Sequence, residues 1–162
     1  GVAHLVQFPA SRGDKYDAPN LKALLADRHR IKLYHFARFD LAAISQYLGV
    51  SASPVYCTRT ASRLVRTFTD RHGLKDLCHD LLRVDISKQQ QSSDWGADNL
   101  SREQLEYAAN DVLFLHEIKL RLDDMLARHE RTELAQACFD FLPARAALDL
   151  AGWLEVDLLA HS

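Results

Sequence analysis

Segments with the composition of β-strands alternate with amphipathic helical segments along this chain, and the alternation limits the fold classes open to it. Residues 31–36 are rich in β-branched and aromatic side chains and predict a strand. A helix with its apolar residues on one face follows, and it is predicted to end at Gly49. Residues 55–58, after Pro54, predict a second strand. Strands that alternate with helices indicate an α/β domain.

Further patterns fit the same class. Residues 2–8 alternate loosely between apolar and other side chains and predict a strand that ends at Pro9. The other helices that we expect cover residues 21–27, 61–67, 74–82 and 132–141, the last of which should end near Pro143.

The clearest helix signal begins at Ser101. Ser101 and Gln104 have the spacing of a capping box, in which each side chain accepts a hydrogen bond from the other residue's backbone N–H. The apolar stripe that follows continues through Leu122 toward Met125 and predicts one long helix.

Length and composition exclude several classes of protein. The chain has 162 residues, of which 48% are hydrophobic and 26% charged, the mixture of a single globular domain rather than of a disordered chain. No apolar run approaches the roughly 20 residues that cross a bilayer, so we expect no membrane span. Cys57, Cys78 and Cys138 are odd in number and widely spaced, which indicates free thiols and a cytoplasmic location.

The net charge of −2 conceals an uneven distribution. Between Arg28 and Lys75 there are nine Lys and Arg residues and only two acids, so this stretch carries +7 and the remainder carries −9. A basic segment in a nearly neutral protein suggests a local surface that binds anions. A solvated basic face explains the pattern equally well.

Three residues have the pattern of a catalytic carboxylate site. Tyr107 and Asp111 are four apart on one helix and therefore project from the same face. Asp40 follows the strand predicted over residues 31–36, at the end of the strand where α/β sheets bind ligands. Each residue by itself has an ordinary structural explanation, such as Asp40 favouring the dipole of a following helix.

Two carboxylates from separate helices, beside a basic surface, suggest phosphoryl chemistry that depends on a divalent metal. Mg²⁺ and Mn²⁺ prefer oxygen ligands, and two such ions about 4 Å apart can activate water against a phosphodiester. Asp40 and Asp111 alone are too few to hold two ions. A glycine-rich phosphate loop, a Gly-x-Ser-x-Gly motif and a His-Glu-x-x-His motif are all absent from the sequence.

Two motifs resemble those of the DEDDy 3′–5′ exonucleases. Residues 35–41, His-Phe-Ala-Arg-Phe-Asp-Leu, resemble the second motif of this family. Residues 107–112, Tyr-Ala-Ala-Asn-Asp-Val, resemble the third motif and include its tyrosine, Tyr107. The region that links them resembles ribonuclease D. Within the family, the segments most similar to the small nano-RNase C (NrnC) branch are residues 57–58, 69–75, 87–95, 137–143 and 160–162.

The resemblance implies a ribonuclease H-like fold, with helices flanking a mixed sheet, and removal of 5′-mononucleotides from the 3′ end of RNA. For the NrnC branch it implies very short RNA, especially dinucleotides, as substrate and a ring-like octamer of subunits. By the same resemblance, Asp111 ligates the first metal ion, Asp40 helps to hold the second, and Tyr107 orients the attacking water.

Four further residues are candidates for binding substrate. We expect Arg38 to meet a phosphate, although a surface arginine is an equally good interpretation. Phe36 is placed to stack on a base or to pack in the core. His35, at the end of the predicted strand, belongs to the same motif, and Lys88 precedes the third motif in a polar loop that would line the substrate entry.

One departure from the family concerns its first motif, an Asp-x-Glu on the opening strand. No Asp-x-Glu occurs before Asp40. We therefore expect residues 1–162 to form a single exonuclease domain that lacks its N-terminal strands and is inactive by itself. Residues 144–162 should form a tail packed on the domain or at a subunit interface, with Trp153 at such an interface.

Two alternatives to a dinucleotide-specific enzyme remain open. The first is a ribonuclease D-like exonuclease that acts on longer RNA. The second is a catalytically inactive RNA-binding or scaffold protein, which the missing Asp-x-Glu favours.

Overall fold

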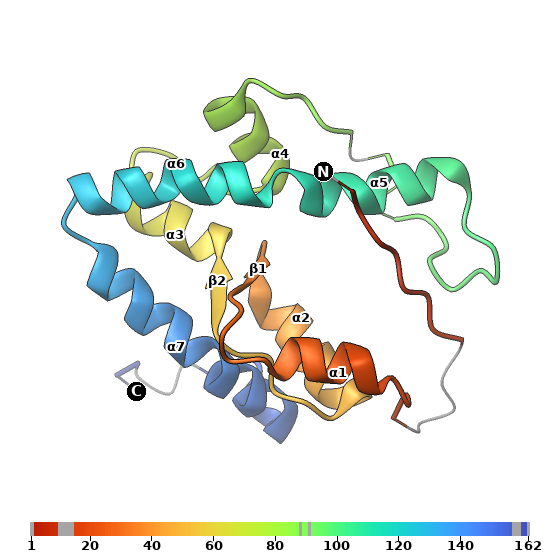
Figure 1. Cartoon of the computed structure of the whole chain (residues 1–162). Coiled ribbons are helices and arrows are strands. Elements are labelled where there is room, and N and C mark those ends of the chain that lie inside the picture. Colours follow the sequence, from red (N-terminus) through yellow and green to blue (C-terminus); the bar gives the residue numbers. More distant parts are fainter. Residues whose placement is uncertain (1, 10–14, 88, 91, 157–159, 162) are drawn as a thin grey trace.

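The computed structural model describes residues 2–9, 15–87, 89–90, 92–156 and 160–161. Helices surround a small central sheet (Figure 1). The elements in chain order are α1 (Pro19–Ala26), β1 (Lys32–Tyr34), α2 (Ala37–Ala43), η1 (Ile44–Leu48), β2 (Val55–Cys57), α3 (Thr58–Val65), α4 (Leu74–Leu77), η2 (Cys78–Leu82), α5 (Arg102–Leu113), α6 (Leu115–Arg128), α7 (Thr132–Leu148) and η3 (Asp149–Trp153). Within the described residues, no helix is both long and apolar enough to span a bilayer.

The sheet consists of β1 and β2, which pair in parallel with Leu33 opposite Tyr56. The connection between them carries α2 and η1, as a parallel crossover requires. The predicted α/β class is therefore confirmed, and in the part of the chain that the structure describes the sheet contains these two strands only.

The prediction of a strand over residues 2–8 is wrong. These residues are irregular, and Val2 and Val6 are 81% and 62% exposed. Alternating side chains form a strand only where a neighbouring strand accepts the backbone hydrogen bonds, and no described strand lies beside this segment.

The capping box predicted at Ser101 is confirmed. The Gln104 backbone N–H donates to Ser101 Oγ at 3.2 Å, and the Ser101 N–H donates to Gln104 Oε1 at 2.8 Å. The helix that begins there is shorter than predicted, because the backbone at Phe114 departs from helical geometry (φ −97°, ψ −5°) and separates α5 from α6. The apolar stripe continues on α6, where Leu115, Ile118 and Leu122 are buried.

The core lies between α6, α7, α3 and β2. Ile118, Leu122 and Leu126 of α6 are at most 2% exposed, and the ring of Tyr56 on β2 lies 4.5 Å from that of Phe139 on α7. Helix α7 does not end at Pro143, contrary to the prediction, but continues to Leu148. Proline removes one backbone hydrogen bond, and burial of Phe139 and of Ala146 on either side holds the helix together across it.

Replacing Leu122 tests this description of the core. Leu122→Ala should lower the free energy of unfolding by about 2–5 kcal/mol, because the side chain is fully buried and its removal leaves a cavity. The control is Leu120→Ala on the same helix, which removes a side chain that is 65% exposed and should leave the unfolding midpoint nearly unchanged. Urea unfolding followed by circular dichroism measures both, and equal losses would contradict the assignment of the buried face.

Candidate functional site

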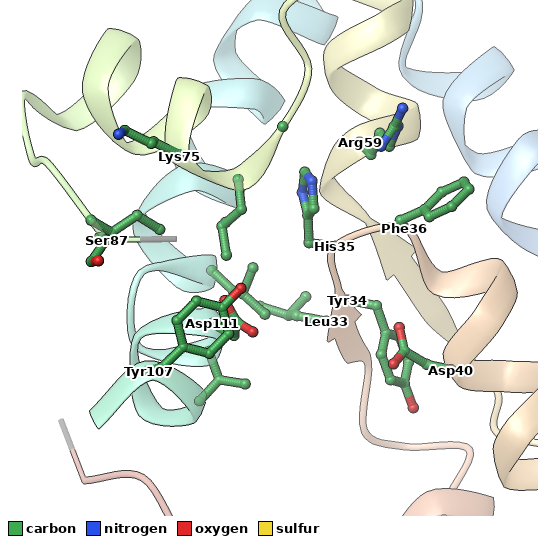
Figure 2. Close-up of a pocket in the computed structure, with 15 residues that line it drawn as sticks. Leu33, Tyr34, His35, Phe36, Asp40, Arg59, Lys75, Ser87, Tyr107 and Asp111 are labelled. Atoms are coloured by element: carbon green, nitrogen blue, oxygen red, sulfur yellow. The ribbon is translucent and has the colours of Figure 1, made fainter. Parts of the chain in front are cut away.

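A cavity of about 420 Å³ opens at the C-terminal end of β1. Its walls come from β1, α2, α3, α4, α5 and the start of α6 and from the residues that follow η2, so segments far apart in sequence meet there (Figure 2). The lining residues are Leu33, Tyr34, His35, Phe36, Asp40, Arg59, Gly73, Leu74, Lys75, Ile86, Ser87, Tyr107, Asp111, Val112 and Leu115. The set includes five of the residues that the sequence motifs singled out: His35, Phe36, Asp40, Tyr107 and Asp111.

The position of Asp40 follows from the start of α2. Phe36 adopts a left-handed conformation (φ 67°, ψ 50°), which ends β1 and turns the chain into α2. Ala37 and Leu41 face the core, at 0% and 3% exposure, so Asp40 is directed away from the core and into the cavity. The pKa of Asp40 is raised to about 6, first because the surrounding chain removes part of its hydration and also because Asp111 is negatively charged.

Asp111 and Tyr107 project together from α5 on the opposite side of the cavity (Figure 2). Partial desolvation raises the pKa of Asp111. The pKa of Tyr107 is raised as well, by desolvation and then by the Asp111 charge, so the phenol stays protonated at neutral pH. The Trp95 ring lies 5.8 Å from the Tyr107 ring and packs against it.

The two carboxylates fit a hard divalent cation. Asp40 and Asp111 both keep access to solvent, and each is less stable as an anion here than in water. A cation between them would offset the desolvation and their mutual repulsion, and oxygen ligands suit Mg²⁺ or Mn²⁺. No group of three or more His, Cys, Asp or Glu side chains able to hold a metal occurs among the described residues, and the carboxylates that line this cavity are Asp40 and Asp111.

Two basic residues, Arg59 and Lys75, form the other end of the cavity, and neither was among the site residues predicted from the sequence. The guanidinium of Arg59 lies over the Phe36 ring, 4.6 Å from its centroid, and its Nε is buried without a hydrogen-bond partner. Figure 2 shows Arg59 and Lys75 on the side away from Asp40 and Asp111. Both belong to the basic stretch of residues 28–75, whose excess charge is the sequence signal for them.

His35 is held by the start of α3. Its Nδ1 lies 2.9 Å from Thr58 Oγ1, and the Thr58 hydroxyl donates to the Tyr34 carbonyl at 3.2 Å. Tyr34 also lines the cavity, and desolvation followed by the nearby Asp40 charge raises its pKa to about 12. Thr58 therefore fixes both the His35 ring and the Tyr34 backbone at the end of β1.

The structure places Arg38 away from the cavity. Its guanidinium makes a bidentate contact with Asp149, with Nε–Oδ2 and Nη2–Oδ1 distances of 2.5 and 2.7 Å. An arginine occupied in this way has little capacity left for a substrate phosphate, so the predicted phosphate contact has no support in its position. The other predicted contact, Lys88, lies outside the described residues.

Comparisons with known proteins identify the family of this chain. A family model described as a 3′–5′ exonuclease matches residues 3–127. NrnC from Brucella melitensis is 58% identical, and the match covers 93% of this chain and 72% of that protein with a TM-score of 0.89. A structure of the same NrnC with bound Mg²⁺ is 55% identical, and the match covers 93% of this chain and 72% of that chain with a TM-score of 0.87. Its structure bound to pGG is 57% identical, and the match covers 90% of this chain and 71% of that chain with a TM-score of 0.88.

Curated sequences give a consistent result. Ribonuclease D of Acidiphilium cryptum is 32% identical over 133 residues, which is 82% of this chain and 34% of that protein. DNA polymerase I of Aquifex aeolicus is 38% identical over 110 residues, 68% of this chain and 18% of that protein. The chain thus spans about a third or less of the length of these curated relatives.

The raised pKa of Asp40 predicts how the stability of the folded chain changes with pH in metal-free buffer. A carboxyl whose pKa is about 6 in the folded chain, against 3.8 ordinarily, binds its proton more tightly when folded, so stability falls as the pH rises through this window. Asp40→Asn should therefore raise the melting temperature at about pH 7.5, and the gain should vanish below about pH 4. Because the side chain keeps solvent access, screening makes the gain modest.

Differential scanning fluorimetry with a chelator measures this effect. The control is Asp124→Asn, which removes an exposed carboxylate of α6 that does not line the cavity. A melting temperature for Asp40→Asn below that of the wild type at about pH 7.5 would show that the carboxylate is stabilising in the folded chain.

Proposed function

This chain belongs to the 3′–5′ exonuclease family, in its ribonuclease D-like and NrnC branch, and on that premise we propose that it hydrolyses very short RNA from the 3′ end with a divalent metal ion. The observation that carries the proposal is the meeting of Asp40, Asp111 and Tyr107 in one cavity, from two helices that are distant in sequence. The products would be 5′-mononucleotides.

Each of the three residues has a distinct task in this proposal. Asp40 and Asp111 would hold Mg²⁺ or Mn²⁺, which supplies charge stabilisation and a nucleophilic water at neutral pH. Tyr107 stays protonated, so its hydroxyl can hydrogen-bond the attacking water and orient it. A structure of Brucella melitensis NrnC contains Mg²⁺, which supports this choice of ion.

The substrate class follows from the size and charge of the cavity. Its volume of about 420 Å³ is in the range of sites for small ligands, and the NrnC structure bound to pGG supports a dinucleotide. Arg59 and Lys75 would bind phosphate, because the buried Arg59 Nε needs an acceptor. Phe36, fixed beneath Arg59, would stack on a base, and His35 beside it would contact the same nucleotide.

A second candidate function is RNA binding without hydrolysis. The observation that favours it is the carboxylate count, since among the described residues the cavity contains only Asp40 and Asp111. Two metal ions need more ligands than one pair of carboxylates supplies. Under this alternative the chain by itself binds pGG and releases no mononucleotide.

One experiment separates the candidates. The chain is incubated with 5′-labelled pGG and Mn²⁺, and in parallel with an RNA of about 20 nucleotides, with and without a chelator. Release of a 5′-mononucleotide from pGG, abolished by the chelator, supports the exonuclease. Faster hydrolysis of the longer RNA would favour a ribonuclease D-like substrate range, and retention of intact pGG would favour RNA binding alone.

Substitutions at the three residues should act on this hydrolysis. Asp40→Asn and Asp111→Asn should each lower the rate by at least about 100-fold, because each removes a metal ligand. Tyr107→Phe should lower it by about 100-fold and leave the KM nearly unchanged, since the hydroxyl is proposed to act on water and not on substrate. Tyr47→Phe changes an exposed tyrosine outside the cavity and is the matched control; full activity of Tyr107→Phe would refute the water-orienting role.

We also propose that the chain is a homo-oligomer in the cytoplasm, a ring-like octamer by its resemblance to NrnC. Four apolar residues on η3 and just after it are 43–49% exposed: Leu150, Trp153, Leu154 and Val156. Clustered exposed apolar residues mark interfaces. In the cytoplasm the free thiols Cys57, Cys78 and Cys138 would stay reduced.

Trp153→Ala tests the assembly. The substitution should shift the elution volume in size-exclusion chromatography toward smaller species, because aromatic residues dominate such interfaces. The control is Phe68→Ala, which removes an aromatic ring that is 78% exposed on a different part of the chain. An unchanged elution volume for Trp153→Ala would contradict the assignment of this interface.

A further inference from the structure

The orientation of Asp40 depends on how α2 is held in place. This helix has seven residues, and its first residue follows Phe36 without a side-chain cap. Helices this short are not stable by themselves, so tertiary contacts determine their position. Ala37 and Leu41 supply the apolar part of these contacts, with α2 packed against α7.

Arg38 supplies a second, ionic contact on the same helix. It lies two residues before Asp40 and pairs through two hydrogen bonds with Asp149 at the start of η3, 111 residues further along the chain. Its Nη2 also donates to the Leu154 carbonyl at 2.6 Å. The Asp149 side chain is only 6% exposed, so water competes little for these bonds.

Asp149 is held from both sides. Arg145, one turn earlier on α7, donates to Asp149 Oδ1 from Nε at 3.0 Å and from Nη2 at 2.5 Å. The same guanidinium reaches the Trp153 and Val156 carbonyls. Hydrogen bonds from Arg38 and then from Arg145 keep the pKa of Asp149 below its usual value, so the carboxylate stays charged.

We infer that Asp149 is a positioning residue for the metal site: its two hydrogen bonds with the Arg38 guanidinium set the orientation of α2 and hence the place of Asp40 in the cavity. Bidentate arginine–carboxylate pairs fix angle as well as distance, which a purely apolar contact does not. This inference rests on the proposed function, because it takes Asp40 as a metal ligand.

A second arginine–aspartate pair with one buried partner provides a comparison. Arg66, directly after α3, is 3% exposed and pairs with Asp80 on η2, which is 29% exposed. Asp80→Asn, like Asp149→Asn, removes the carboxylate of such a pair, and the more buried partner is Arg66 in this pair and Asp149 in the other. Neither Arg66 nor Asp80 lies on a helix that carries Asp40 or Asp111. The pair therefore controls for general destabilisation.

The test measures Mn²⁺ affinity by electron paramagnetic resonance at a temperature where every variant is folded. Asp149→Asn and Arg38→Gln should each weaken Mn²⁺ binding by about tenfold, the lower end of the range for residues that orient metal ligands. The double variant should bind no more weakly than either single variant, because both break one link. Asp80→Asn, which leaves the Arg38–Asp149 pair in place, should stay within about twofold of the wild type.

Amide hydrogen exchange of residues 38–43 gives a readout that does not depend on metal. Faster exchange in Asp149→Asn than in Asp80→Asn supports the link, and equal exchange overturns it. Unchanged Mn²⁺ affinity in Asp149→Asn, or an equal loss in Asp80→Asn, also overturns it. A wild-type chain that binds no Mn²⁺ contradicts the proposed function and with it the metal-positioning role, whereas the exchange rates still decide whether Asp149 holds α2.

Discussion

Burial of Ala37 and Leu41 against the core is the contact on which the candidate site depends. These two side chains determine which face of α2 turns inward, and Asp40 takes its direction from that choice. On the other wall the capping box at Ser101 fixes where α5 begins and therefore where Tyr107 and Asp111 point. Helices α2 and α5, distant in sequence, thus bring two carboxylates to one cavity.

The cavity separates its charges, and this separation suits a phosphodiester. Asp40 and Asp111 at one end would repel an anionic substrate, and partial desolvation strengthens that effect. A divalent cation at this end and the cations Arg59 and Lys75 at the other would together convert the cavity into a site for nucleotides (Figure 2). The Arg59–Phe36 contact adds an aromatic surface with a fixed orientation, which stacking on a base requires.

Local patterns predicted the elements well where neighbouring residues decide the structure. The capping box of Ser101 and the end of η1 at Gly49, which has a positive φ of 69°, both follow from short-range chemistry. The prediction of a strand over residues 2–8 was wrong, because a segment becomes a strand only when it pairs with a neighbouring strand. The prediction that a helix ends at Pro143 was also wrong, because burial of Phe139 and Ala146 keeps the chain helical across the proline. The break at Phe114 has no signal in the apolar spacing, because the stripe continues on both sides of it.

The sequence by itself determined the α/β class, the capped start of α5 and the residue types of the site, because periodicity, capping and motif spacing involve residues within a few positions of one another. Only the tertiary structure decided that Arg38 faces Asp149 and not the cavity, and that Arg59 and Lys75 take up the basic end. The physical reason is the distance along the chain. A pair 111 residues apart, or a cavity built from six elements, arises from packing of the whole core and leaves no trace in local spacing.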